Sequence, residues 1–236
     1  MPDAALFKQY NSILKKVPLF EGISEENRAS MLACIGARAA EFPRGADIVR
    51  AGEQTRGVGV LLAGEAQVCK EDAFGRRSII TDLGKGDVFG EVFVCAGIRK
   101  SPVTVIALAD AAALFLDYER MINTCSASCP FHAMLIRNML KILAQKNLGL
   151  NRKIDYLTIK SLRGRIAAYL LSLASEQAWE TVRVPFDRNG LADYLGADRS
   201  ALSRELGRMR DEGLVAYHKN EFHILEREKL RELYPH

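Results

Sequence analysis

The sequence predicts an α+β protein with three consecutive parts: an N-terminal antiparallel β-roll (jelly-roll-like), one long helix, and a C-terminal winged helix-turn-helix. Short alternating segments separated by glycines run from about residue 42 to 116. An apolar repeat at helical spacing follows, and two short amphipathic helices with a hairpin pattern come near the C-terminus. We expect domain boundaries at residues 1–120, 121–159 and 160–236.

Composition and charge are those of a folded globular protein. Of the 236 residues, 48% are hydrophobic and 26% are charged. The net charge of +4 permits a nucleic-acid partner without requiring one. No apolar run reaches the roughly 20 residues that cross a bilayer, so we expect no membrane partner. The five cysteines are odd in number and do not form a disulfide framework, which favours a reducing, cytoplasmic location.

The segment before the β-roll predicts two short helices. Apolar residues from Leu6 to Val17 fall on one helical stripe, which Pro18 ends. Ser24 has the position of an N-cap for a second helix that runs to about Ile35. The period then changes to that of short strands. Glycines mark the turns between these strands, at Gly45, Gly52, Gly64, Gly75, Gly84, Gly86 and Gly90.

A long helix is expected from about Pro130 to Leu157, with Pro130 in its first turn. Its apolar residues repeat every 3.5 positions, which is typical of a coiled-coil seam. A seam can pack on its own domain, but this one is narrow, and Asn147 at an a position is a device that fixes register between identical helices. A parallel homodimer is therefore the favoured interpretation. The seam consists of Ile136, Leu140, Leu143, Asn147, Leu150, Ile154 and Leu157.

The segment from residue 188 to 211 predicts two helices joined by a tight turn at Gly196, with Asp198 as the N-cap of the second helix. The following hairpin makes the motif winged, with Lys219 at the wing tip. In such motifs the second helix enters the DNA major groove and its first turns contact base edges. A solvated helix face in a protein–protein module is the alternative. The outward residues, and so the DNA-binding candidates, are Arg199, Ser200, Ser203 and Arg204.

These features together give the chain a resemblance to the CRP/FNR family of bacterial transcription regulators over roughly residues 12 to 235. The motifs that carry it are "VPLF", "GDVFGE", "GRIAAYLLSLA" and "LADYLGADRSALSRELGRMRDEGL". The resemblance implies a homodimer that binds a two-fold DNA site, contacts RNA polymerase and responds to an effector in the β-roll. Arg199 and Arg204 match the family's recognition-helix arginines, and Ser203 matches a serine of the FNR branch. Ser200 replaces a base-contacting glutamate of many members, which implies an altered half-site.

The resemblance also locates an effector pocket. Family members that bind cyclic AMP carry Gly-Glu and, some ten residues later, Arg-Ser, and here Gly90 and Glu91 match the first pair. At the second pair stand Ser101 and a proline, which cannot neutralise a phosphate or donate an N–H. Two further candidates, Arg99 and Lys100, come two residues early and belong either to another anion site or to a solvated turn. Leu150 and Asn151 occupy the adenine-reading positions, where a leucine cannot hydrogen-bond a base. We therefore expect an unknown small-molecule effector other than cyclic AMP.

A metal- or redox-sensing regulator is the alternative function, with Cys125, Cys129 and His132 as candidate ligands. No fourth ligand is visible and the first 33 residues hold no cysteine, so we predict no metal site. The remaining cysteines, Cys34, Cys69 and Cys95, have the pattern of core residues.

We do not expect an enzyme. A β-barrel oxygenase needs two histidines and a carboxylate inside the barrel. The four histidines, His132, His218, His223 and His236, all lie outside the strand region. No nucleophile elbow, phosphate-binding loop or dinucleotide motif is present.

Overall fold

The structure is a computed structural model that divides into two compact units, Met1–Ala144 and Gln145–His236. Helix α6 (Pro130–Thr158) contributes residues to both units. Its observed bounds agree with the helix expected from about Pro130 to Leu157. The structure describes residues 9–55, 57–71, 77–123, 130–176 and 181–234.

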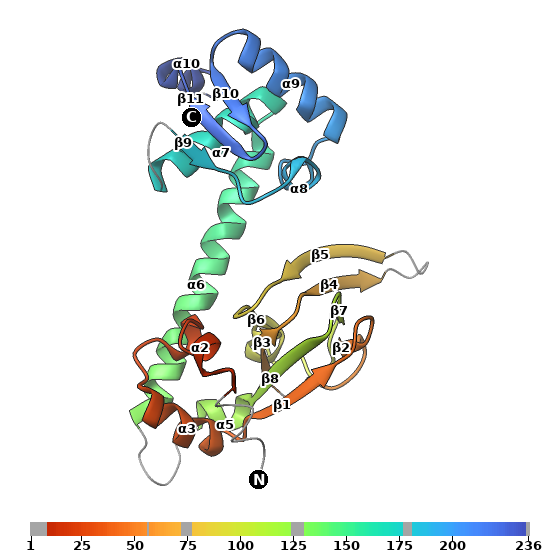
Figure 1. Ribbon diagram of the computed structural model, residues 1–236, viewed down its shortest axis with the longest axis vertical. Coiled ribbons are helices and arrows are strands. Elements are labelled where there is room, and N and C mark those ends of the chain that lie inside the picture. Colours follow the sequence, from red (N-terminus) through yellow and green to blue (C-terminus); the bar gives the residue numbers. More distant parts are fainter. Residues whose placement is uncertain (1–8, 56, 72–76, 124–129, 177–180, 235–236) are drawn as a thin grey trace. The chain divides into compact units, whose positions relative to one another are not determined.

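The first unit contains two antiparallel four-stranded sheets, with strand orders β1-β8-β3-β6 and β2-β7-β4-β5 (Figure 1). This arrangement confirms the predicted β-roll. The strands are β1 (Arg38–Phe42), β2 (Asp47–Val49), β3 (Gly57–Ala63), β4 (Ala66–Glu71), β5 (Arg77–Leu83), β6 (Val88–Phe89), β7 (Thr104–Ala107) and β8 (Ala111–Asp117). The helical elements besides α6 are α2 (Asn11–Leu14), η1 (Pro18–Phe20), α3 (Glu25–Cys34), α4 (Glu91–Cys95) and α5 (Tyr118–Ile122).

Strands β3 and β8 are buried on both faces because each contributes to two cores. Alternate side chains of a strand point to opposite faces of the sheet. Val58 and Val60 of β3 therefore join the core beneath helices α2, α3 and α5, whereas Leu61 joins the core between the two sheets. In β8, Leu114 packs on the helical side and Ala113 on the inner side. Near-continuous apolar runs result in place of a simple alternation.

Helix α6 is anchored to the first unit by one side. Leu135, Met139 and Ile142 are buried in the core that underlies the short helices. The buried amide of Asn138 donates hydrogen bonds to the backbone oxygens of Leu19 and Glu21, at 3.0 and 2.9 Å. These bonds satisfy one carbonyl of the "VPLF" turn and that of the residue after it, and they restrain the rotation of the helix about its axis.

The second unit holds the C-terminal helices and a three-stranded sheet of order β10-β11-β9. One apolar core joins the end of α6, helices α7 to α9 and the hairpin, with Leu202, Leu206 and Phe222 fully buried. The predicted winged helix-turn-helix is confirmed. Its elements are α7 (Leu162–Glu176), β9 (Thr181–Arg183), α8 (Arg188–Tyr194), α9 (Arg199–Asp211), β10 (Val215–His218), β11 (Glu221–Ile224) and α10 (Arg227–Glu232).

Asp198 and Ser24 occupy the predicted N-cap positions of α9 and α3, although neither side chain makes a capping hydrogen bond. The prediction for two of the cysteines needs correction. Cys34 is exposed and Cys95 is half-buried, so of the three cysteines predicted for the core only Cys69 is buried there. Both errors arise at helix ends, where sequence spacing does not fix the direction of a side chain.

Among the described residues, no helix is long and apolar enough to span a bilayer.

Candidate nucleic-acid interface and effector cavity

The two helices α8 and α9 are held at a sharp turn by backbone geometry and by one arginine. Gly196 has φ +62°, a conformation in which an L side chain is strained. Arg165 of α7 donates to the carbonyl oxygens of Leu195 and Gly196, at 3.0 and 3.1 Å, and also to Ile159 O at 2.8 Å. The turn of the motif is therefore bonded to the segment that follows α6.

The outward face of α9 is polar and accessible along its first two turns. Arg199, Ser200, Ser203 and Arg204 are all exposed, whereas Leu202 on the opposite face is fully buried. Within the described part of the chain, neither Arg199 nor Arg204 forms an ion pair with an acidic side chain. Both guanidinium groups are thus presented to solvent on a rigid helix, which is the arrangement that base-edge reading needs.

The wing is the β10–β11 hairpin, closed by a two-residue turn at Lys219 and Asn220. Lys219 has φ +53°, the one non-glycine residue with positive φ in the described chain. It is exposed. The hairpin thus places one ammonium group at its tip, as the sequence indicated.

The β-roll contains a cavity of about 750 Å³, which is large enough for a small organic ligand. Apolar side chains from both sheets and from α4 form most of its wall, including the aromatic rings of Phe89, Phe93 and Phe115. The rings of Phe89 and Phe115 pack edge to face, with their centroids 6.1 Å apart. A Cβ on Gly59 would lie 2.2 Å from the Phe89 ring, so that ring needs the glycine beside it. The polar groups of the wall are Arg38, Glu53, Gln54, Thr55, Ser101, Asp117 and Arg120.

Comparisons with known proteins match both units. The family model of the cyclic nucleotide-binding domain matches residues 39–128, and that of the Crp-like helix-turn-helix domain matches residues 164–233. The chain belongs to the CRP/FNR family of transcription regulators. It is a DNA-binding regulator that carries a cyclic nucleotide-binding domain.

Similar CRP/FNR members span nearly the whole chain. The CRP-like cAMP-activated global transcriptional regulator of Mycobacterium tuberculosis is 24% identical over 226 residues, covering 93% of this chain and 97% of its own. The cyclic AMP receptor protein of Thermus thermophilus is 23% identical, with 93% and 98% covered. Among solved structures, the c-di-GMP responsive regulator CLP of Xanthomonas campestris has a TM-score of 0.59 at 19% identity, with 85% and 99% covered. The catabolite activator protein of Thermus thermophilus has a TM-score of 0.51 at 22% identity, with 92% and 97% covered. These structures share the fold.

The residues that match the CRP/FNR phosphate-binding segment are placed as follows. Gly90 lines the cavity and has φ +77°, and Glu91 beside it is buried at the start of α4. Ser101 also lines the cavity, but its hydroxyl donates to Val103 O at 2.6 Å. Its proton is therefore already used in a hydrogen bond within its own turn. Arg99 and Lys100 are exposed and are not part of the cavity wall. The cavity is therefore present without an arginine at the expected phosphate position.

The remaining effector candidates and the predicted seam lie on α6. Leu150 and Asn151 are exposed and belong to the second unit, whereas the cavity belongs to the first. Their role in effector binding stays a prediction. Asn151 donates to the side-chain oxygen of Asn147 at 2.9 Å. Along the seam, Ile136 and Leu143 are half-buried and the other members are exposed, namely Leu140, Asn147, Leu150, Ile154 and Leu157.

The proposed metal or redox ligands are only partly described. Cys125 and Cys129 lie outside the described residues. His132 is buried, and its Nε2 lies 3.1 Å from the carbonyl oxygen of Arg120. This contact gives His132 a structural role in joining α6 to α5. Among the described residues, no group of three potential ligands could hold a metal ion.

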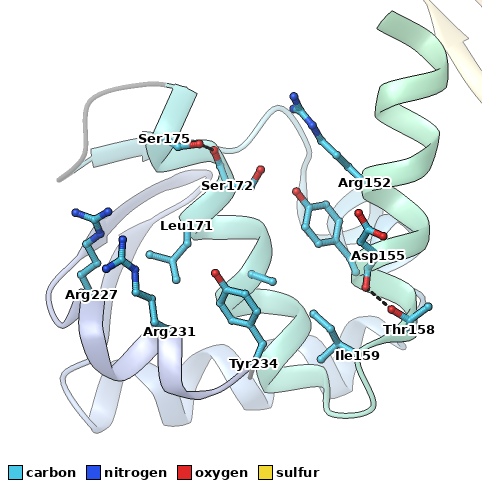
Figure 2. A pocket seen from close by; sticks show the side chains of 12 residues that line it. Arg152, Asp155, Thr158, Ile159, Leu171, Ser172, Ser175, Arg227, Arg231 and Tyr234 are labelled. Atoms are coloured by element: carbon cyan, nitrogen blue, oxygen red, sulfur yellow. Dashed lines mark hydrogen bonds between the residues drawn. The ribbon is translucent and has the colours of Figure 1, made fainter. Parts of the chain in front are cut away.

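Two sets of cavity residues were not predicted. In the β-roll, Arg38 and Asp117 lie at strand ends and Arg120 lies in α5, and no sequence motif marks them. Figure 2 shows the second set, in a cavity of about 630 Å³ within the second unit. Side chains of α6, α7 and the C-terminal segment line it, with Arg227 and Arg231 on α10. It contains no residue of α8 or α9.

Proposed function

We propose that this chain is a homodimeric, effector-responsive, cytoplasmic CRP/FNR regulator whose effector is not cyclic AMP. It reads a two-fold symmetric DNA site with α9, using Arg199, Ser200, Ser203 and Arg204, while Lys219 of the wing contacts phosphate. RNA polymerase is its partner in transcription, as family membership implies. The observation that carries the proposal is the pair of exposed guanidinium groups at the start of an otherwise anchored α9.

Base reading is supported by the chemistry and rigidity of the α9 face. An arginine can donate two hydrogen bonds to guanine O6 and N7, and a serine hydroxyl can serve a base or a phosphate. Rigid presentation matters because a side chain on a mobile loop would lose more conformational freedom on binding. Here the helix is held from behind by buried Leu202, Leu206 and Met209.

Dimerisation is supported by the apolar face that α6 leaves uncovered within one chain. Leu140, Leu150 and Ile154 are 62%, 63% and 57% exposed. Such a stripe at heptad spacing is covered when two copies of the helix pair in parallel. Pairing also provides the two-fold axis that a symmetric DNA site requires, with recognition helices about 34 Å apart.

An effector other than cyclic AMP is supported by the cavity wall. Holding a cyclic phosphate in an apolar cavity requires a positive group or several N–H donors directed at it. At the matching position Ser101 is neutral and its hydroxyl is bonded to Val103, and the neighbouring cations Arg99 and Lys100 are exposed. The two arginines that do line the cavity, Arg38 and Arg120, lie outside the segment that matches the phosphate-binding motif. The aromatic rings of the wall suit a small molecule with a substantial apolar surface.

Selection from a random duplex pool tests the function. The purified full-length protein should enrich a two-fold symmetric sequence with half-site centres about one helical turn apart. A sequence without symmetry, or no enrichment at all, would refute the proposed DNA reading.

The effector is tested separately. Titration calorimetry with cyclic AMP should give no saturable heat, and saturable binding would contradict this part of the proposal. Mass spectrometry and absorption spectroscopy of protein purified without oxygen would identify a retained small molecule, haem or metal.

A further inference from the structure

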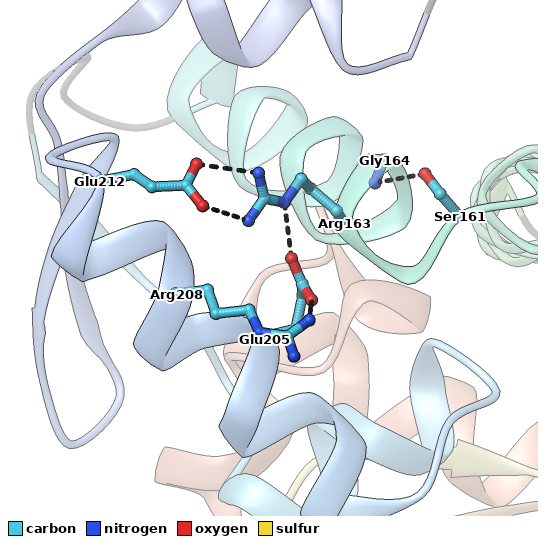
Figure 3. Close-up of polar contacts among 6 residues, drawn as sticks. All are labelled: Ser161, Arg163, Gly164, Glu205, Arg208 and Glu212. Atoms are coloured by element: carbon cyan, nitrogen blue, oxygen red, sulfur yellow. Dashed lines mark hydrogen bonds and ion pairs between the residues drawn. The ribbon is translucent and has the colours of Figure 1, made fainter.

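The side chain of Arg163 in α7 forms hydrogen bonds to two carboxylates, those of Glu205 in α9 and of Glu212 at its C-terminal end. The guanidinium of Arg163 donates from Nη1 and Nη2 to the two carboxylate oxygens of Glu212, at 2.8 and 2.7 Å. Its Nε donates to Glu205 at 2.5 Å. Figure 3 shows Arg163 between the two carboxylates, with Arg208 beside Glu205. We call Arg163, Glu205 and Glu212 the α7–α9 clamp.

The clamp spans about two helical turns, from Glu205 within α9 to Glu212, the C-cap residue that follows the helix. Glu205 and Glu212 are seven residues apart, which at 1.5 Å and 100° per residue places them on one helix face about 10 Å apart. A single planar group bonded to both therefore limits both the rotation of α9 about its axis and its sliding along α7. Apolar packing through Leu202 and Leu206 is non-directional and restrains these two motions less strongly.

The clamp combines a single contact to Glu205, which is largely shielded from solvent, with a bidentate contact to Glu212, whose side chain is 48% exposed. The side chains of Arg163 and Glu205 are only 27% and 15% exposed. Bidentate pairing between arginine and carboxylate adds geometric specificity to the attraction. The hydrogen bonds to both carboxylates raise the pKa of Arg163, and the bond from Arg163 lowers the pKa of Glu212. Each shift favours the charged form of its group.

The clamp is continuous with the face that reads DNA. Glu205 directly follows Arg204 in α9, so the direction of one side chain fixes that of the other at 100° around the helix. Glu205 also pairs with Arg208 at 3.5 Å, one turn further along. The carboxylate of Glu205, which is 15% exposed, therefore contacts Arg208 directly and is linked to Arg204 only through the helix backbone.

We propose that Arg163 is a positioning residue for sequence reading: it sets the orientation of α9, and thereby the register of Arg204 against base edges, without contacting DNA. This inference rests on the proposed role of α9 as recognition helix. Loss of the clamp lets α9 rotate. Discrimination between sequences then falls, whereas attraction to the phosphate backbone, which depends on charge and not on register, is kept.

The test uses the full-length protein and the duplex that the wild type selects from a random pool. The Arg163→Met variant keeps the length of the side chain and removes its donors. The ratio of affinities for the selected duplex and a random duplex should fall about tenfold, comparable to the loss of one base-pair contact. The slope of affinity against salt concentration should change little, because Arg163 contacts no phosphate.

Arg231→Met is the matched control. Among the residues that the structure describes, Arg231 forms an ion pair only within its own helix, with Glu228, at 2.9 Å. Its replacement therefore removes the same charge without loosening α9. The specificity ratio of this variant should equal that of the wild type. Arg163→Lys should be intermediate, since an ammonium group cannot bond two carboxylates with a planar fork.

A double-mutant cycle separates positioning from general destabilisation. In a Glu205→Gln/Glu212→Gln background, Arg163→Met should cost no further specificity, because its partners are already neutral. An additive loss in that background, or an unchanged ratio in Arg163→Met alone, would overturn the inference while leaving the proposed function intact.

Hydrogen exchange provides a readout that needs no DNA. The amides of α9 should exchange faster in Arg163→Met than in Arg231→Met, while those of the β-roll should not change. If the wild type selects no symmetric sequence, the proposed function fails, and equal α9 exchange in both variants would then overturn the clamp as well.

Discussion

Because one apolar face of α6 is uncovered in the single chain, we predict that Leu150→Ala weakens the dimer. Leu150 is 63% exposed in the single chain. Full burial of a leucine side chain is worth about 1.5–3 kcal/mol, so covering this exposed part contributes about 1–2 kcal/mol per protomer. Two copies contribute about 2–4 kcal/mol to a symmetric dimer. At about 1.4 kcal/mol per factor of ten, the dimer dissociation constant should rise roughly 30- to 700-fold.

Analytical ultracentrifugation across a wide range of protein concentration measures this change directly. Leu148→Ala is the matched control, because Leu148 lies on the same helix with 57% exposure but outside the heptad seam. Alanine favours helices, so neither variant should lose helical content by circular dichroism.

The comparison of the two variants decides the argument. We expect Leu150→Ala to shift the monomer–dimer equilibrium and Leu148→Ala to leave it almost unchanged. Equal effects of the two substitutions, or a wild-type protein that sediments as a monomer at all concentrations, would show that the seam does not mediate pairing.

Three further outcomes follow from the second unit. Arg204→Ala should cost about 1–3 kcal/mol of discrimination at one base pair, measured by competition with singly substituted duplexes, and unchanged affinity for selected and random duplexes would refute base contact. Lys219→Asn removes the wing charge but tolerates the positive φ. It should weaken binding to all duplexes alike and reduce the salt slope by about one, whereas an effect confined to one sequence would contradict a phosphate contact. The pKa of Glu212 is lowered in the folded protein by Arg163, so its stabilising effect is present above the ordinary carboxyl pKa and lost as the pH falls through the lowered value. Urea unfolding across acidic pH should show this loss in the wild type but not in Glu212→Gln, and identical pH profiles would contradict the assignment.

Much of the second unit follows from local sequence. Gly196 between two apolar-periodic segments predicts a sharp turn, and its φ of +62° agrees with that. Exposure of Arg199 and Arg204 follows from the spacing of the leucines that oppose them. Helical periodicity depends on residues close together in the chain, so it can be predicted from the sequence.

Contacts between segments that are distant in the sequence could not be predicted in this way. No pattern around Arg163 indicates that it meets Glu205 and Glu212, which are 42 and 49 residues away. The lowered exposure of Glu205 is likewise a product of packing against α7. The outward face of α9 was therefore predictable from the sequence, whereas the clamp that holds α9 was not.

In the β-roll, too, local features were predictable from the sequence and long-range contacts were not. Glycines and alternation predicted its short strands, because strand period and turn chemistry are local. They did not reveal that β3 and β8 are buried on both faces, or that Phe89, Phe93 and Phe115 form one cavity wall. The order of the main parts of the chain and the buried faces of α8 and α9 were thus predicted from the sequence alone. Which side chains share a cavity or an ion pair was decided by the tertiary structure, because those distances depend on how the whole chain closes on itself.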